Sequence, residues 1–398
     1  MLAQAKAEVH QLGFTLVAYM QGTPRSTFTP HHSPSALDRE RIMDLESTVR
    51  ITAECLCKRH SFGTEIPQSR LPLEGNVCHC HSCRHSTGAL YVLQSTWPQP
   101  RADVNTSGLH KYQFSANIAN LFCVTCSTPM FSELAWDPGN LGVFSGPLKN
   151  IEVAPIKLTN HIYVEDTVDG GASVERRWPG VSNLAEPRGE PVQESVGISC
   201  HCKGVNLVLH HGDYAGRERE ELPWYIDPRN NKRLASFDAC DSCRLHFGND
   251  IVHWTFTNLA DISQANGGPF PRTMTELKTA VDAGDAAVGT LACYQSSPDA
   301  DRYFCRVCAA AVFYASGDRP EIVDVAVGLL EALDGARAER FLSWTLGETP
   351  VWMDDTKGGW REALMKRVQS DAEEFRLGRG YEKSWRRLAK EGKSKLSF

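Results

Sequence analysis

The sequence has no long apolar run, no excess of positive charge and no leader-like start. Its best membrane candidate, Ile322 to Leu333, is interrupted by Asp324 and Glu331 and falls short of the roughly twenty apolar residues that a membrane helix needs. Lys and Arg number 42 against 48 Asp and Glu, and this net charge of −6 argues against a surface dominated by nucleic-acid binding. The first residues lack the basic start and apolar core of a secretory signal, and Glu8 interrupts them. We therefore expect a cytoplasmic protein without membrane contact, with the nucleus as the alternative compartment.

Cysteine is too dilute for a disulfide-stapled scaffold, since there are 14 in 398 residues. The spacing of the cysteines is more informative than their number. Groups two or three positions apart, well separated along the chain, are typical of thiolates that converge on a soft metal ion. Apolar residues make up 41% of the chain and charged residues 23%, which is sufficient for a packed core and excludes wholesale disorder.

The cysteines form an internal repeat. Each half contains, in order, a Cys-x-Cys pair, a Cys-x-Ser-Cys-Arg segment with a glycine shortly after it, and an aromatic residue before a Cys-x-x-Cys pair. In the first half these are Cys55–Cys57, Cys80–Arg84 with Gly88, and Phe122–Cys126; in the second they are Cys200–Cys202, Cys240–Arg244 with Gly248, and Phe304–Cys308. The second half carries extra residues only between these clusters, where loops of a shared scaffold tolerate insertions. The sequence therefore predicts two tandem copies of one domain.

The segments between the clusters have the pattern of short strands. Runs of β-branched or aromatic residues lie at Leu90–Leu93, Val205–Leu209, Ile251–Phe256 and Val312–Tyr314. The insertion at Met274–Ala287 has a helical pattern instead. We therefore expect a mainly β protein with five parts: a partly disordered N-terminal extension at 1–47, a first zinc domain at 48–165, a linker at 166–195, a second zinc domain at 196–345 and a basic helical tail at 346–398.

The C-terminal segment differs in charge from the rest of the chain. From Asp355 to Phe398 it holds 12 Lys or Arg and 7 Asp or Glu. Apolar and aromatic residues such as Trp360, Leu364 and Val368 follow helical spacing. We expect a helix that packs this stripe on the second domain and leaves its cations in water. An arm for nucleic acid or membrane is the alternative interpretation.

The cysteine clusters allow two kinds of metal site. A Cys-x-Cys pair and a distant Cys-x-x-Cys pair together supply the four ligands of a closed structural zinc site. The first half has in addition a triplet, Cys78, Cys80 and Cys83, which supplies only three thiolates. Three ligands leave one position for a substrate thiol or water. Two alternatives stay open: His79 or His81 completes the tetrahedron, or the triplet is a set of buried reduced cysteines.

The order Cys-x-Cys, Cys-x-Cys-x-x-Cys-Arg-x-x-x-Gly, aromatic-Cys-x-x-Cys resembles the glutathione-dependent formaldehyde-activating enzyme family, which includes centromere protein V. The resemblance covers residues 48–165 and 196–345. It implies a β-tent fold, a small mainly β zinc domain, and carbon–sulfur lyase chemistry that joins or splits formaldehyde and glutathione as S-hydroxymethylglutathione. Carried over to this chain, it implies a structural Zn²⁺ on Cys55, Cys57, Cys123 and Cys126 and a second Zn²⁺ on Cys78, Cys80 and Cys83.

The second half departs from the family pattern at one ligand. Asp238 stands where the first half has Cys78, so its second site has two thiolates, Cys240 and Cys243, and a carboxylate, which is a harder ligand. We therefore expect chemistry only in the first half. The structural Zn²⁺ of the second half would be held by Cys200, Cys202, Cys305 and Cys308. A smaller departure is that Ser127 and Ala309 replace the glycine that usually follows the last cysteine.

Several neighbouring residues have more than one interpretation. Arg84 is a candidate for holding a carboxylate of a peptide thiol such as glutathione. The alternative is a structural ion pair, or a hydrogen bond to metal-bound sulfur, because Arg244 persists where the triplet is incomplete. His79 and His81 are candidates to orient or protonate a leaving thiol, or plain surface residues. Cys293 is a spare thiol, more typical of a small buried apolar residue than of a ligand.

Three functions fit these patterns. The first is a zinc-dependent carbon–sulfur lyase acting on a thiol adduct such as S-hydroxymethylglutathione. The second is a non-catalytic zinc-binding interaction module; the acidic body and the lack of basic and aromatic residues interleaved around the cysteines argue against nucleic acid as its partner. The third is a degenerate scaffold kept for its fold. The intact first triplet argues against this third function, and an open coordination position would separate the enzyme from the interaction module.

Overall fold

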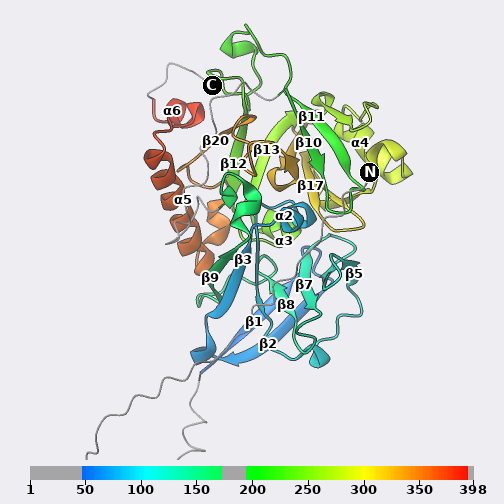
Figure 1. Ribbon diagram of the computed structural model, residues 1–398, viewed down its shortest axis with the longest axis vertical. Helices are drawn as coiled ribbons and strands as arrows, with labels where there is room; N and C mark the ends of the chain where they lie inside the picture. Colours follow the sequence, from blue (N-terminus) through cyan, green and yellow to red (C-terminus); the bar gives the residue numbers. More distant parts are fainter. Residues whose placement is uncertain (1–46, 173–193, 393–398) are drawn as a thin grey trace, which may run out of the picture. The chain divides into compact units, whose positions relative to one another are not determined.

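The computed structural model describes residues 47–172 and 194–392 (Figure 1). The predicted N-terminal extension at 1–47, but for its last residue, and most of the predicted linker at 166–195 lie outside this range. The described chain is mainly β, with four sheets and five α-helices. None of these helices is both long and apolar enough to cross a membrane.

The first half consists of a two-stranded ribbon and a seven-stranded sheet. The ribbon pairs β1 (Thr48–Glu54) with β2 (Ser61–Pro67) in antiparallel fashion. The sheet has the order β5-β6-β7-β8-β4-β3-β9, with the bounds His110–Gln113, Ile118–Phe122, Pro129–Leu134, Gly142–Phe144, Val92–Thr96, Leu73–Cys78 and Ile156–Ile162. Helix α2 (His81–Thr87) follows β3, so one strand end and one helical turn carry the cysteine triplet.

The second half repeats this plan. Its seven-stranded sheet has the order β15-β16-β17-β18-β13-β12-β20, with the bounds Leu291–Ser297, Ala300–Cys305, Ala311–Ser316, Ile322–Ala326, Val252–Asn258, Arg233–Asp238 and Leu342–Trp344. Its smaller sheet has the order β14-β11-β10-β19, with the bounds Ile262–Gln264, Asn206–His210, Ser195–Ser199 and Leu330–Glu331. Helix α3 (Asp241–Phe247) follows β12 as α2 follows β3.

The two large sheets have the same strand order and the same directions of pairing. In each, the last strand of the order is parallel to its neighbour, β9 to β3 and β20 to β12, and the other pairs are antiparallel. The register also agrees, because Cys78 pairs with Val92 and Asp238 pairs with Val252. The internal repeat seen in the cysteine order is therefore a repeat of the fold.

The strands predicted from residue pattern are present, with ends shifted by one to three residues. The run at Val312–Tyr314 lies within β17, and the run at Leu90–Leu93 overlaps the start of β4. The helical insertion is also present, as α4 (Met274–Ala283), which begins at a Thr273 cap and buries Leu277 and Val281. A short 3-10 turn at Ala286–Val288 replaces the end of the predicted helix.

Two short helices lie where the halves meet. Helix α2 packs on the 3-10 turn Val327–Leu329 of the second half, and α3 packs on β7 of the first half. Two equivalent backbone hydrogen bonds cross the junction: the Gly146 N–H donates to the Gly248 carbonyl at 3.0 Å, and the Gly328 N–H donates to the Gly88 carbonyl at 2.9 Å. Gly88 and Gly248 end the two helices in the left-handed conformation, with φ of 87° and 70°. The repeated glycine of the sequence thus ends a helix and accepts a bond from the other half.

The C-terminal tail contains α5 (Trp360–Gly378) and α6 (Trp385–Lys390), as its spacing predicts. Its cations do not all lie in water. The Arg361 guanidinium is fully buried; its Nε bonds Asp250 at 2.9 Å and its Nη2 bonds the Ser145 carbonyl at 2.8 Å. Since Asp250 belongs to the second half and Ser145 to the first, the start of α5 is fastened to both.

Candidate metal centre

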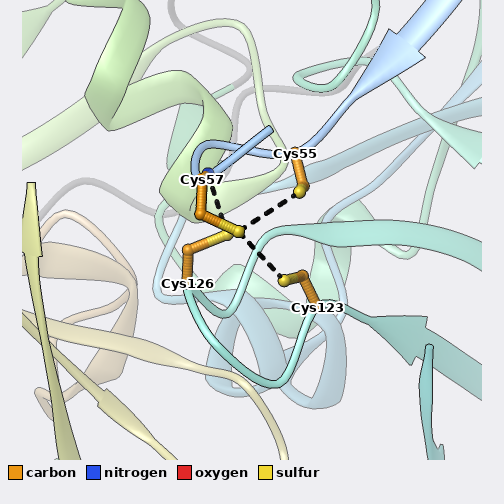
Figure 2. Close-up of side chains that lie close together, drawn as sticks. All are labelled: Cys55, Cys57, Cys123 and Cys126. Carbon is orange, nitrogen blue, oxygen red and sulfur yellow. Dashed lines mark hydrogen bonds between the residues drawn. The ribbon is translucent and has the colours of Figure 1, made fainter. Parts of the chain in front are cut away.

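The first four-cysteine site forms between two turns. Cys55 and Cys57 lie between β1 and β2, and Cys123 and Cys126 lie between β6 and β7. All four sulfurs are within 4.8 Å of one another and point toward a common centre (Figure 2). The Cys57 Sγ is 3.6 Å from that of Cys55 and 3.5 Å from that of Cys123. The two predicted pairs therefore meet, although 66 positions separate Cys57 from Cys123.

The second four-cysteine site repeats this geometry. Cys200, Cys202, Cys305 and Cys308 also lie within 4.8 Å of one another. The Cys202 Sγ is 3.5 Å from that of Cys200 and 3.4 Å from that of Cys305. Sulfurs around a tetrahedral Zn²⁺ lie about 3.8 Å apart, given a Zn–S bond of about 2.3 Å. Both sites therefore have the ligand number and spacing of structural zinc.

Backbone N–H groups face the sulfurs of both sites. The His60 N–H donates to the Cys55 Sγ at 3.3 Å, and the Val205 N–H donates to the Cys200 Sγ at 3.2 Å. Hydrogen bonds accepted from neighbouring thiols lower the pKa of Cys123 and Cys305, whereas donating hydrogen bonds to Cys123 and Cys126 raises the pKa of Cys55. Donors aimed at sulfur stabilise thiolates, the form that binds metal.

The triplet in the first half opens into a cavity. Cys78 ends β3, Cys80 caps α2 and Cys83 lies in its first turn; the three sulfurs are within 4.8 Å of one another. The Cys83 N–H donates to the Cys80 Sγ at 3.3 Å. This bond and those from the other two thiols lower the pKa of Cys80, the thiols contributing most. All three cysteines line a cavity of about 550 Å³, within the range of about 300–1,000 Å³ for small-molecule sites.

The cavity walls come from the sheet and from aromatic residues. Asn76, Gln94 and Asn120 line it from β3, β4 and β6, and Phe114, Trp136 and Tyr163 also line it. Its charged lining residues are Glu74, Asp137 and Asp166, and no Lys, Arg or His of the described chain lines it. The site therefore combines soft ligands with acidic and apolar walls.

Neither histidine beside the triplet joins it. His79 is fully buried, and its Nε2 is 2.7 Å from the Nδ1 of His161. His81 groups instead with His85 and Glu331. Within residues 47–172 and 194–392, no fourth His, Cys, Asp or Glu atom belongs to the triplet group. This arrangement favours a three-ligand site over a closed one.

The equivalent site in the second half is filled by an arginine. Asp238, Cys240 and Cys243 lie within 4.8 Å of one another, as their sequence positions predict. The Arg302 Nη1 donates to the Cys243 Sγ at 3.4 Å, and the Arg302 side chain is almost fully buried. Burial raises the pKa of Asp238 to about 8. A guanidinium against these groups supplies the positive charge that a metal would otherwise supply.

The first half has Asn120 at the position of Arg302. Each lies three residues before the first cysteine of its Cys-x-x-Cys pair, Cys123 or Cys305, on equivalent strands β6 and β16. Sequence reasoning missed this difference, although alignment of the two halves on their cysteines would have found it. The alignment could not have shown that this strand position faces the triplet cavity.

The two arginines after the triplets are both buried. The Arg244 Nη1 donates to the Gly146 carbonyl, and also to the Leu148 carbonyl at 3.2 Å, so Arg244 joins the two halves. Arg84 is 4% exposed and is not among the cavity-lining residues. Its Nε and Nη1 have no hydrogen-bond partner among the described residues. The structural alternative holds for Arg244, while the role of Arg84 as a substrate contact stays a prediction.

Comparison with known proteins gives a family match within the first half. Residues 50–166 match the family model of the glutathione-dependent formaldehyde-activating enzyme. This range contains the first four-cysteine site and the triplet. No curated protein and no solved structure matches the chain.

Proposed function

We propose that the first half is a zinc-dependent carbon–sulfur lyase that acts on a thiol adduct such as S-hydroxymethylglutathione. The observation that carries the proposal is the convergence of three cysteine sulfurs, without a fourth protein ligand among the described residues, on a cavity of about 550 Å³. The family match over residues 50–166 supports the reaction class. We also infer that the second half is a non-catalytic copy of the same domain, because Arg302 lies against its triplet.

The residues of the cavity have distinct roles in this proposal. Cys78, Cys80 and Cys83 hold the zinc, which when bound supplies a Lewis acid that stabilises the substrate sulfur as a thiolate. The carbon–sulfur bond breaks with its electron pair on sulfur, the hydroxyl carbon becomes the carbonyl carbon of formaldehyde, and the hydroxyl proton passes to water. Phe114 and Trp136 give the cavity apolar walls that shield the reacting sulfur.

The walls also constrain the thiol. Three carboxylates and no cationic side chain of the described residues line the cavity, so an ammonium group on the substrate is favoured and additional carboxylates are not. Glutathione carries both kinds of group. The substrate survey should therefore compare the hydroxymethyl adducts of glutathione and of a cationic thiol such as cysteamine.

A non-catalytic interaction module is the second candidate. Trp136 and Tyr163 line the cavity and are 64% and 55% exposed, and exposed aromatic residues are enriched where proteins bind one another. In that case the triplet would be a structural site, and no thiol adduct would be turned over.

The test combines measurement of zinc per chain with measurement of the turnover of these hydroxymethyl thiol adducts. The wild type should hold three tight zinc ions per chain and release formaldehyde. Cys80→Ala should lose one zinc and all turnover while remaining folded, because the four-cysteine sites are intact. Cys240→Ala, the matched control in the second half, should retain its zinc content and its turnover. Loss of a zinc ion from Cys240→Ala, or equal loss of activity in both variants, would contradict the proposal. A fully loaded but inactive wild type would favour the interaction module.

A further inference from the structure

A second group of metal-ligand side chains lies between the two halves, outside the cysteine sites. His81 and His85 are one turn apart on α2 of the first half, and Glu331 lies in β19 of the second half. One ligand atom from each lies within 4.8 Å of the other two. Two imidazoles and one carboxylate form a ligand set that binds zinc in many proteins.

The buried histidine of this group is held in one tautomer. The His85 Nδ1 is 2.6 Å from the Ser199 carbonyl oxygen, which cannot donate, so Nδ1 carries the proton. The Nε2 therefore has a free lone pair. It is buried and has no hydrogen-bond partner among the described residues, and His85 is only 1% exposed. A histidine whose one nitrogen donates to a backbone carbonyl while the other is bare has the arrangement of a metal ligand.

The other two ligands are able to complete the site. His81 is exposed and stacks on His85, with ring centroids 3.9 Å apart and planes at 17°. Ligand nitrogens and oxygens of a tetrahedral zinc lie about 3.4 Å apart, so the group must contract by about 1.4 Å at most. Rotation of the His81 and Glu331 side chains, which are both exposed, would bring the ligand atoms closer together.

Two cations compete with a metal for this position. The Lys203 Nζ is 2.5 Å from the Glu331 Oε1, and Ser199 also donates to that oxygen. Arg84 lies near enough to act on both imidazoles. These charges disfavour Mg²⁺ and Ca²⁺, which depend on carboxylates, more than metals that bind imidazole strongly, such as Zn²⁺, Cu²⁺, Ni²⁺ and Co²⁺.

We propose that His81, His85 and Glu331 form a metal site for Zn²⁺ or a related transition metal, which links α2 of the first half to the small sheet of the second. This site is separate from the cysteine clusters and does not depend on the proposed lyase activity. Bound metal exchanges the Lys203–Glu331 ion pair for a bond that spans the two halves. Occupancy therefore stabilises the junction beside the triplet.

Titration of the full-length protein with Co²⁺ tests the site, after its chelator-resistant metal has been counted. The wild type should bind one further equivalent, with visible bands of nitrogen and oxygen ligation and without sulfur-to-cobalt charge transfer. His85→Ala and Glu331→Gln should weaken this binding by more than about 100-fold, since even outer-shell changes cost 10- to 100-fold. His81→Ala, at an exposed position, serves if His85→Ala fails to fold.

Three further variants show whether the additional metal binds at this site or elsewhere on the chain. His210→Ala removes an exposed histidine of the second half and should leave the affinity unchanged. Lys203→Met should strengthen binding, because it removes the competing ammonium. Cys80→Ala should retain the additional equivalent, which separates this site from the triplet. Absence of the additional equivalent in the wild type, or its persistence in His81→Ala and Glu331→Gln alike, would overturn the proposal.

Discussion

At the scale of single residues, the two halves differ at a strand position that faces the triplet. Asn120 leaves the first cavity open, whereas Arg302 brings a guanidinium to the Cys243 sulfur. Asp238 in place of Cys78 removes one soft ligand. The Arg302 guanidinium then provides a positive charge beside the remaining thiols. Loss of the ligand and gain of the arginine therefore act in the same direction.

Transfer of this arginine to the first half should close its site. Asn120→Arg should lower the zinc content by one per chain and abolish adduct turnover, because the guanidinium competes with the metal for the same sulfurs. Metal analysis of the purified variant measures this directly. Asn120→Gln, which adds length without charge, is the control and should keep its zinc. Full zinc content in Asn120→Arg would show that this strand position does not govern the triplet.

The four-cysteine sites should be essential for folding. Structural zinc contributes on the order of 10 kcal/mol to folding, so Cys57→Ser or Cys305→Ser should give insoluble or unfolded protein. Solubility and the thermal melting profile are the measurements. Cys293→Ser is the control, because Cys293 belongs to none of the cysteine clusters in the described chain. A wild-type melting profile for either ligand variant would refute the structural role.

At the scale of elements, the junction depends on close backbone approach at α2 and α3. A Cβ atom at Gly328 would lie 2.2 Å from the Ala89 carbonyl oxygen, and one at Gly146 would lie 2.3 Å from the Asn249 nitrogen. Both contacts are with backbone, which cannot move aside as a flexible side chain would.

The junction also explains one departure from the family pattern. The Ser127 hydroxyl is 2.8 Å from the His246 Nδ1 of α3, although its φ of 60° would suit glycine better.

Substitution at this junction should therefore destabilise the fold. Gly328→Ala should lower the free energy of unfolding by about 1–3 kcal/mol, the usual cost of overpacking. Urea-induced unfolding measures the change. Gly139→Ala is the matched control, because a Cβ at Gly139 meets nothing within 4 Å. Equal stability of the two variants would mean that the halves do not pack through these glycines.

At the scale of the whole molecule, the C-terminal tail is part of the packed structure. Arg361 and Asp250 form an ion pair with both side chains fully buried, and the Asn150 side chain of the first half donates to the Thr356 carbonyl at 2.9 Å. The sequence predicted helical packing of the tail from its apolar spacing. It could not show that a cation of the tail is buried, because Asp250 lies 111 positions away.

Deletion of residues 355–398 should destabilise the protein strongly. It leaves Asp250 as a buried charge without its partner, and removing one member of such a pair costs about 3–5 kcal/mol. Thermal melting should show the loss, while the zinc content of the folded fraction stays unchanged. Truncation after Gly378 keeps α5 and should cost less. Tight DNA binding at physiological salt that disappears on deletion would instead assign the tail a nucleic-acid role.

The sequence by itself determined which cysteines can hold metal and that the chain repeats. Cysteine spacing is a local property, and the short separations of Cys55 from Cys57 and of Cys80 from Cys83 survive in any fold that forms a thiolate site. The order of these clusters was also enough to predict the triplet and its incomplete counterpart. The mainly β class followed from the short β-branched runs.

Only the tertiary structure decided what surrounds each cluster. Which strand position faces the triplet depends on the pairing of β6 with β7 and on the direction in which each residue points, and these are set by contacts distant in sequence. The junction is likewise non-local, because His85 of α2 meets Ser199 of β10 across 114 positions. The metal-binding capacity of the cysteines follows from their residue type and spacing. The open cavity, the arginine beside the second triplet and the buried ion pair exist only once the halves have packed.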